Sequence, residues 1–109
     1  MDADAMQTHP KNRIDIVIEQ AAVPRLTAIL DDADGVSGYV VVSVHGGKGD
    51  HGTWSRNGLV SEADGMMLIT CVVDPQYKDA ILDRVFPFIE QRSGIVTISP
   101  CEVIRDERF

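Results

Sequence analysis

The chain has 109 residues, of which 44% are apolar and 25% charged, with 17 acidic against 10 basic side chains. These values are typical of one globular domain. The net charge of −7 argues against binding to DNA, RNA or an anionic membrane, because neutralising phosphates requires a basic face. The longest uncharged apolar run, residues 66–73, is too short to span a bilayer, and the polar N-terminus lacks the apolar core of a signal peptide. We therefore expect a cytoplasmic protein.

The first half of the chain shows one helical and two strand-like patterns. Residues 1–12 are polar and without periodicity, which predicts a mobile arm. Isoleucines alternate with other residues over 14–18, the period of a β-strand. Apolar residues recur at helical spacing over 22–33, and Gly35 follows where a helix end favours glycine. A second strand is expected over 39–45.

Residues 46–65 hold six of the nine glycines and show no regular period. A loop of this length is uncommon inside a small domain and is usually functional or disordered. Gly47, Gly49 and Gly52 spell GxGxxG after a strand, but the helix that a Rossmann site requires does not follow. Closely spaced glycines let backbone N–H groups converge on an anion, and Lys48 adds a positive charge. The plain alternative is a flexible hairpin tip.

The second half repeats the order of the first. A strand is expected over 66–73, and the Asp-Pro pair at 74–75 is typical of a helix start. Pro87 is expected to kink or end this helix. The run over 95–99 predicts a fourth strand, which Pro100 should stop.

This order of elements predicts an α+β, ferredoxin-like βαββαβ sandwich, with both helices on one face of a four-stranded antiparallel sheet. We assign the domain to residues 13–109. Both faces of the sheet are apolar, with Val40 and Val42 on one side and Val41 on the other. A second apolar face indicates an interface, so we expect a homo-oligomer that packs sheet against sheet. Cover by the chain's own arm or tail is the alternative.

Other candidate sites have less support. Cys71 and Cys101 form no CxxC pair and are expected to be reduced core thiols. His45, Asp50 and His51 are candidate metal ligands, but no well-spaced further ligand is evident, so we assign no metal site. No nucleophile has a base and an orienting group, so no catalytic residue is assigned. The predicted central strands lack the aromatic and basic residues that RNA recognition needs.

The chain resembles the PII and PII-like signalling proteins. The most specific match is VHGGKGDHG, which stands where the family's T-loop begins, between strands two and three, and the likeness covers residues 14–108. The acidic balance and the SGIVTISP segment resemble the carboxysome-associated PII-like branch more than the nitrogen-sensing branch. The resemblance implies a homotrimer that binds adenine nucleotides in clefts between subunits and docks on its target through the T-loop.

The resemblance also implies a nucleotide-binding site made from three segments. The T-loop base, the phosphate-holding B-loop and the C-terminal segment would contribute, in that order, Gly46, Gly47, Lys48 and Gly49; Arg92, Ser93 and Gly94; and Arg105 and Arg108. Each group has a plain alternative. Arg92 is also a helix C-terminal charge, Gly94 a helix stop, and the tail arginines a solvated end.

The sequence departs from the nitrogen-sensing members in ways that bear on the ligand. Gly94 runs directly into residues 95–97 without a longer glycine-rich B-loop and its lysine, which favours ADP or AMP over ATP. The T-loop has no tyrosine for uridylylation and no glutamine for magnesium and 2-oxoglutarate. For the carboxysome-associated branch the family implies bicarbonate, an anion that glycine N–H groups and an arginine can hold.

The favoured hypothesis is a non-enzymatic PII-like regulator that binds ADP or AMP, with bicarbonate. It would act on a bicarbonate transporter or another inorganic-carbon protein. The alternative is a trimeric divalent-metal-binding protein of the cation-tolerance type, which shares the fold and would use His45 and His51. An enzyme at the subunit interface has no residue constellation behind it.

Overall fold

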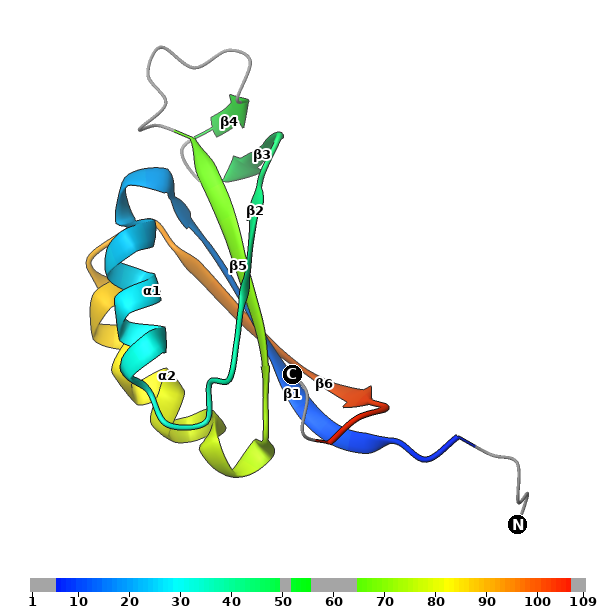
Figure 1. The fold of residues 1–109 in the computed structure, drawn as a ribbon. Coiled ribbons are helices and arrows are strands. Elements are labelled where there is room, and N and C mark those ends of the chain that lie inside the picture. Colours follow the sequence, from blue (N-terminus) through cyan, green and yellow to red (C-terminus); the bar gives the residue numbers. More distant parts are fainter. Residues whose placement is uncertain (1–5, 50–51, 56–64, 107–109) are drawn as a thin grey trace.

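The computed structural model describes residues 6–49, 52–55 and 65–106 (Figure 1). No helix in these ranges is both long enough and apolar enough to cross a membrane. In chain order the elements are β1 (His9–Glu19), a 3₁₀ turn (Gln20–Ala22), α1 (Val23–Asp32), β2 (Val40–Ser43), β3 (Gly46–Gly49), β4 (Gly52–Ser55), β5 (Met66–Val73), α2 (Pro75–Glu90) and β6 (Ile95–Val103).

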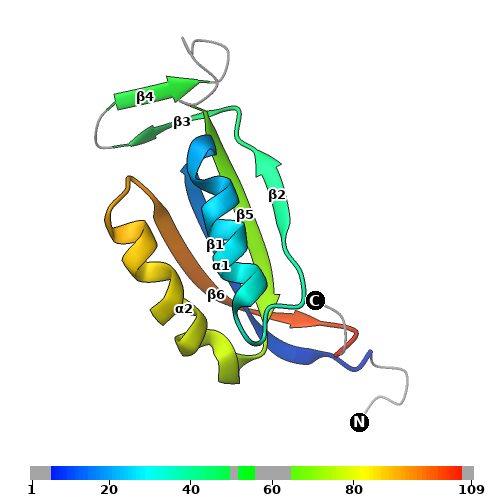
Figure 2. The same cartoon turned by 60° about the vertical axis from the view of Figure 1, so that its left-hand side comes forward.

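The main sheet has four strands in the order β2-β5-β1-β6, each antiparallel to its neighbours. β1 is central, with Glu19 opposite Met66 of β5 and His9 opposite Val103 of β6. Both helices lie on one face of this sheet (Figure 2). The ferredoxin-like α+β fold predicted from the order of the elements is therefore confirmed.

The core lies between the sheet and the two helices. Ile14, Ile16 and Ile18 of β1 are fully buried and alternate with less buried residues, as a strand with one covered face requires. The other buried apolar residues are Ala22, Leu26, Leu30, Ala33, Ile69, Cys71, Val73, Ile81, Val85 and Ile89. Each large aliphatic side chain in this layer stabilises the fold by about 1.5–3 kcal/mol relative to exposure.

The connection after α1 depends on a glycine. Gly35 has a φ of 91°, which favours glycine, and a Cβ at this position would lie 2.3 Å from Cγ of Tyr77 in α2. Nearby, Arg84 of α2 donates hydrogen bonds to the backbone carbonyl of Asp32 (2.9 Å) and to its carboxylate (2.7 Å). A cation at the C-terminal end of α1 also suits the helix dipole. These contacts fix the two helices to each other.

The sheet face away from the helices carries apolar side chains, as predicted. The register places Val42 opposite Leu68 and Val40 opposite Thr70 on this face. Val40, Val42 and Ile95 remain 46%, 43% and 58% exposed, so neither the arm nor the tail covers them in the described part of the chain. The oligomer that such a patch suggests stays a prediction.

The prediction that Pro100 stops its strand is wrong, and α2 does not end at Pro87. β6 runs through Pro100, which lies opposite Asn12. An edge strand tolerates proline because half of its N–H groups face away from the sheet. Pro87 lies on the exposed side of α2, which continues beyond it. Burial of Val85 and Ile89 on either side of Pro87 offsets the lost backbone hydrogen bond.

The sheet begins earlier, and the glycine-rich segment is more regular, than the sequence predicts. Residues 9–12, expected in the mobile arm, form the first part of β1 because the last residues of β6 pair with them. Within the expected irregular loop, residues 46–49 and 52–55 pair as an antiparallel hairpin of β3 and β4. The loop over 56–64 and the start of the arm over 1–5 lie outside the described residues.

Candidate nucleotide-binding site

Two of the three predicted segments lie at the same end of the main sheet (Figure 1). At this end, which we call the hairpin end, β1 finishes opposite Met66, and the β3–β4 hairpin follows β2. Val17 lies opposite Ile95, so β6 also starts here. The hairpin end therefore holds both Gly46–Gly49 and the connection over 91–94 between α2 and β6.

Arg92 is held at the end of α2 by contacts within its own chain. Its Nη1 donates a hydrogen bond to the carbonyl of Phe88 at 2.8 Å, and its guanidinium lies 3.8 Å from the centroid of the Phe88 ring. Its Nε lies 3.7 Å from Oε1 of Glu19, and the side chain is only 19% exposed. These contacts give Arg92 the helix-ending role of the plain alternative. An anion at this position would have to share the guanidinium with Glu19.

The turn after Arg92 is tight. A Cβ at Gly94 would lie 3.2 Å from Cγ2 of Ile89 and 3.4 Å from the carbonyl oxygen of Val17. Glycine thus lets β6 start directly beside α2 and β1. Ser93, next to it, is exposed. Because residues 91–94 are the whole connection, it offers few backbone N–H groups to a ligand.

The base of the predicted T-loop is extended. Gly46 lies opposite Ser55 and Lys48 opposite Thr53, so β3 is paired along its length. In a paired strand successive N–H groups point in opposite directions, and these glycines do not form the concave anion cradle expected from their spacing. Lys48 is exposed at the hairpin end, where its charge can meet an anion.

Arg105 lies at the opposite end of the sheet. It follows Val103, which pairs with His9 at the start of β1, and it is exposed. Arg108 lies outside the described residues. Most of β1, roughly 25 Å of strand at 3.3 Å per residue, separates this end from the hairpin end. One chain therefore does not bring Arg105 and Lys48 to the same nucleotide.

The sequence did not predict a buried charge cluster at this second end. Lys11 is 6% exposed, and its Nζ donates to the carboxylate of Asp74, to Oδ1 of Asp106 (2.9 Å) and to the Asp106 carbonyl (3.3 Å). The hydrogen bonds to Asp74 and then Asp106 raise the pKa of Lys11, and Lys11 in turn lowers the pKa of Asp106. The pairing register of β1 and β5 could have revealed this cluster, since pairing Asn12 with Val73 puts Lys11 beside Asp74.

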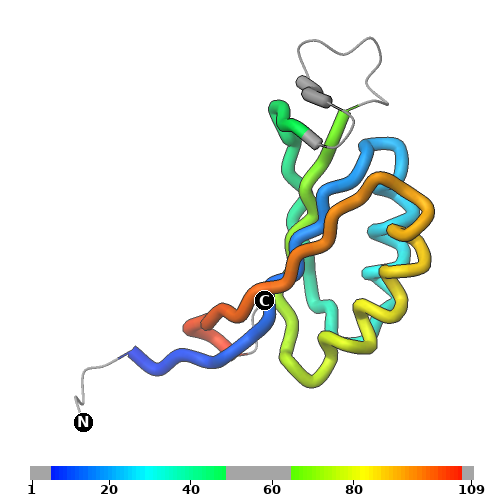
Figure 3. Tube along the Cα trace, turned by 180° about the vertical axis from the view of Figure 1, so that it is seen from behind, coloured from blue at the N-terminus to red at the C-terminus, as the bar shows by residue number. Residues whose placement is uncertain are grey.

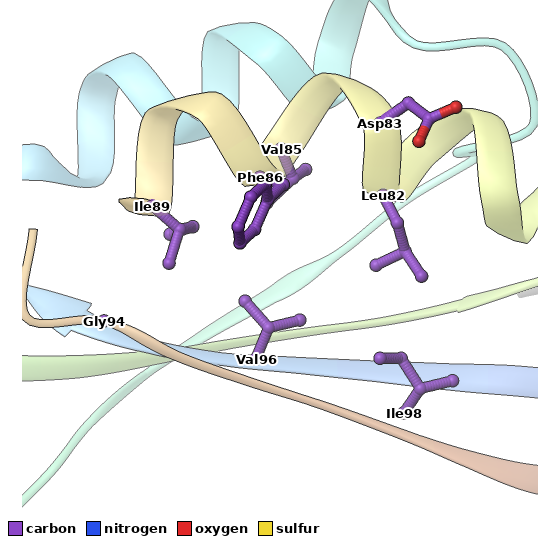
Figure 4. Close-up of a pocket in the computed structure, with 8 residues that line it drawn as sticks. All are labelled: Leu82, Asp83, Val85, Phe86, Ile89, Gly94, Val96 and Ile98. Carbon is purple, nitrogen blue, oxygen red and sulfur yellow. The ribbon is translucent and has the colours of Figure 1, made fainter. Parts of the chain in front are cut away.

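A groove of about 510 Å³ lies between α2 and β6 at the free sheet edge (Figure 4). Its lining residues are Leu82, Asp83, Val85, Phe86, Ile89, Gly94, Val96 and Ile98. Phosphate binding needs N–H donors and positive charge, and the one charged group here is a carboxylate. The groove of a single chain is therefore not a phosphate site.

The cysteines and the candidate metal ligands are separate from these segments. Cys71 is a free thiol in the core, as predicted, and burial raises its pKa to about 11. Cys101 is a half-buried free thiol. His45 is exposed, and Asp50 and His51 lie outside the described residues. Within the ranges the structure describes, no three His, Cys, Asp or Glu residues are grouped to hold a metal ion.

Comparison with known proteins gives matches over nearly the whole chain. The sequence matches the family model for nitrogen regulatory protein P-II over residues 11–108. CPII, a nitrogen regulatory PII-like protein from Thiomonas intermedia K12, has been solved bound to ADP, AMP and bicarbonate. It is 31% identical over 93% of this chain and 94% of its own, with a TM-score of 0.82.

Two further structures agree with that match. CPII bound to ADP and bicarbonate gives a TM-score of 0.79 at 31% identity, over 93% of this chain and 95% of that one. A PII-like signalling protein from Thermus thermophilus gives 0.75 over 94% and 97%, but at 20% identity it supports the fold alone. No curated protein matches the chain significantly.

The chain combines a four-stranded ferredoxin-like α+β sheet with a glycine-rich hairpin between β2 and β5, the fold that it shares with the PII-like structures. The chain belongs to the P-II family of nitrogen regulatory proteins, because the family model and a 31% identical relative each cover almost all of it. The family resemblance drawn from VHGGKGDHG is thereby confirmed.

Proposed function

We propose that this protein is a non-enzymatic PII-like regulator of the carboxysome-associated branch. It binds ADP or AMP, together with bicarbonate, at the interfaces of a homotrimer. The observation that carries this proposal is the likeness to CPII of T. intermedia, whose structures hold ADP, AMP and bicarbonate.

The distribution of cations supports a site between subunits. Lys48 and Arg92 lie at the hairpin end, whereas Arg105 lies at the other end of β1. A neighbouring chain can supply Arg105 where its own chain cannot. The uncovered apolar patch that includes Val40 and Val42 offers a surface for such a neighbour. The nucleotide would then contact Gly46, Gly47, Lys48, Gly49, Arg92, Ser93 and Gly94, with Arg105 and Arg108 coming from an adjacent subunit.

The short connection before β6 supports a preference for ADP or AMP over ATP. Each added phosphate oxygen needs N–H donors or a cation to replace its lost hydration. Residues 91–94 supply few such groups, and Arg92 already bonds Phe88 and faces Glu19. A third phosphate would therefore be poorly compensated.

The regulatory output is assigned to residues 46–65, which stand in the place of the family's T-loop. Fixing glycine-rich backbone costs entropy, so ligand contacts at Gly46–Gly49 would change the free energy with which this segment docks on a target. The target we propose is a bicarbonate transporter or another inorganic-carbon protein, in line with bicarbonate as the second ligand.

Isothermal titration calorimetry with ADP, AMP and ATP, each with and without bicarbonate, tests the proposal. We expect saturable binding of ADP and AMP, weaker binding of ATP and a change in affinity with bicarbonate. Arg105→Ala should weaken ADP binding about tenfold or more, since a charged phosphate contact is lost, while Arg25→Ala on exposed α1 should not. Light scattering should give the mass of a trimer. Absence of nucleotide binding, with a melting temperature raised by divalent cations instead, would favour the cation-tolerance alternative.

A further inference from the structure

A buried lysine joins three segments that are far apart in the sequence. Lys11 belongs to β1, Asp74 lies between β5 and α2, and Asp106 lies in the segment after β6. An ammonium has three donors, and the acceptors here are the Asp74 carboxylate and the carboxylate and carbonyl of Asp106. Figure 3 shows the chain turning back after β6. The segment after β6 is therefore held at Asp106 by the buried ammonium group of Lys11.

Strand pairing in the main sheet does not by itself require the contacts of Lys11 with Asp74 and Asp106. Asp74 is the residue before α2, where an aspartate usually caps the helix, yet its side chain makes no capping hydrogen bond and contacts Lys11 instead. A buried ammonium needs a partner, and the register already supplies Asp74. The two further acceptors both come from Asp106, which is 66% exposed. The contacts of Lys11 with Asp106 therefore serve to fix the backbone of residues 104–106.

Arg105 lies between two fixed points. Val103 is paired within the sheet, and Asp106 is bonded to Lys11. The backbone of Arg105 is held on both sides while its side chain stays exposed. A guanidinium on a free tail would lose backbone freedom when it bound a phosphate, and this loss would weaken binding. On an anchored segment most of that freedom is already lost in the unliganded protein.

We propose that Lys11 is a positioning residue for the nucleotide site: through Asp106 it presents Arg105 to the phosphates of the bound nucleotide. This inference rests on the proposed function, which assigns Arg105 to phosphate binding. Lys11 itself touches no ligand. Its effect is to preorganise the C-terminal segment.

Asp106→Ala is the test variant, because it removes the anchoring carboxylate from an exposed position without disturbing the core. Calorimetry with ADP and with adenosine, which lacks phosphates, gives two affinities for each protein. We expect ADP affinity to fall about threefold to tenfold and adenosine affinity to stay unchanged. In an Arg105→Ala background, Asp106→Ala should cause no further loss. Asp79→Ala, an 85% exposed carboxylate on α2, is the charge-matched control and should bind ADP normally.

Cα order parameters from ¹³C relaxation of the ligand-free protein give a second readout. The order parameters of residues 104–106 should be lower in Asp106→Ala than in the wild type, and Lys11→Met should have the same effect. Unchanged order parameters, or equal losses of ADP and adenosine affinity, or additive losses with Arg105→Ala, would overturn the positioning role. If the wild type binds no ADP, the proposed function itself fails. Normal ADP binding by Asp106→Ala refutes this inference alone.

Discussion

Arg92→Ala tests the structural role of this residue independently of its assignment to phosphate binding. The substitution removes a hydrogen bond of 2.8 Å from a charged donor to the Phe88 carbonyl, a cation–π contact of 3.8 Å and an ion pair of 3.7 Å with Glu19. Typical values are about 1.5–3 kcal/mol for a charged hydrogen bond, 0.5–1 for cation–π and 0–1 for a solvated ion pair. Water can replace part of the hydrogen bond at the helix end. We therefore expect a loss of about 2 kcal/mol in the free energy of unfolding.

Urea denaturation at a fixed protein concentration and without nucleotide measures this loss. The fixed concentration matters because an oligomer's stability depends on it. Arg25→Ala, on the exposed side of α1, is the control and should change the free energy of unfolding by less than about 0.5 kcal/mol. If Arg92→Ala changed it no more than that control, the contacts with Phe88 and Glu19 would contribute nothing, and the helix-ending role of Arg92 would be refuted.

Three further predictions concern the fold and the C-terminal segment. Gly35→Ala should destabilise the protein by about 2–5 kcal/mol in urea denaturation, because the positive φ costs about 1–2 kcal/mol and overlap with Tyr77 about 1–3 kcal/mol. Cys71 should resist thiol reagents at pH 8 in the folded protein, since its pKa of about 11 and its burial leave little accessible thiolate. The Cα order parameters of residues 104–106 should stay constant between about pH 5 and 9. Because the pKa of Asp106 is lowered, its carboxylate stays charged and holds the segment until the pH falls through that lowered pKa. Because the pKa of Lys11 is raised, its ammonium group stays charged until the pH rises through that raised pKa.

Each of these has a clear contrary result. The Gly35 prediction would be wrong if Gly35→Ala lowered the free energy of unfolding no more than Gly38→Ala does. Gly38 lies in the same connection and has no positive φ. The Cys71 prediction would be wrong if Cys71 reacted with thiol reagents as fast in the folded protein as in the unfolded chain. For the C-terminal segment, a fall in the order parameters of residues 104–106 between neutral pH and pH 9 would mean that the charges on Lys11 and Asp106 do not hold it.

Features set by local periodicity could be predicted from the sequence. The isoleucines over 14–18 and the run over 66–73 alternate or cluster because burial imposes that pattern, and both segments are strands. Features set by strand pairing could not be predicted in the same way. β6 passes Pro100 because it is an edge strand, and the first residues of β1 are ordered because β6 reaches them. Neither property belongs to a short window of sequence.

In the candidate site, too, some features could be predicted from the sequence and others depend on how distant segments meet. The glycine-rich segment and Lys48 were found by composition and family resemblance, yet the hairpin that pairs Gly46–Gly49 depends on residues further along the chain. The contacts of Arg92 with its own chain follow from where α2 meets β1. The Lys11 cluster draws on positions 11, 74 and 106, so only the register and the return of the C-terminal segment bring it together.

Calorimetric titration of the full chain with ADP in the presence of bicarbonate tests the central claim most directly. A site between subunits of a homotrimer predicts saturable binding with one nucleotide per chain. Arg105→Ala should weaken that binding while leaving the trimer intact. An absence of saturable heat with ADP, AMP and ATP alike, from protein shown to be folded and trimeric, would contradict the account.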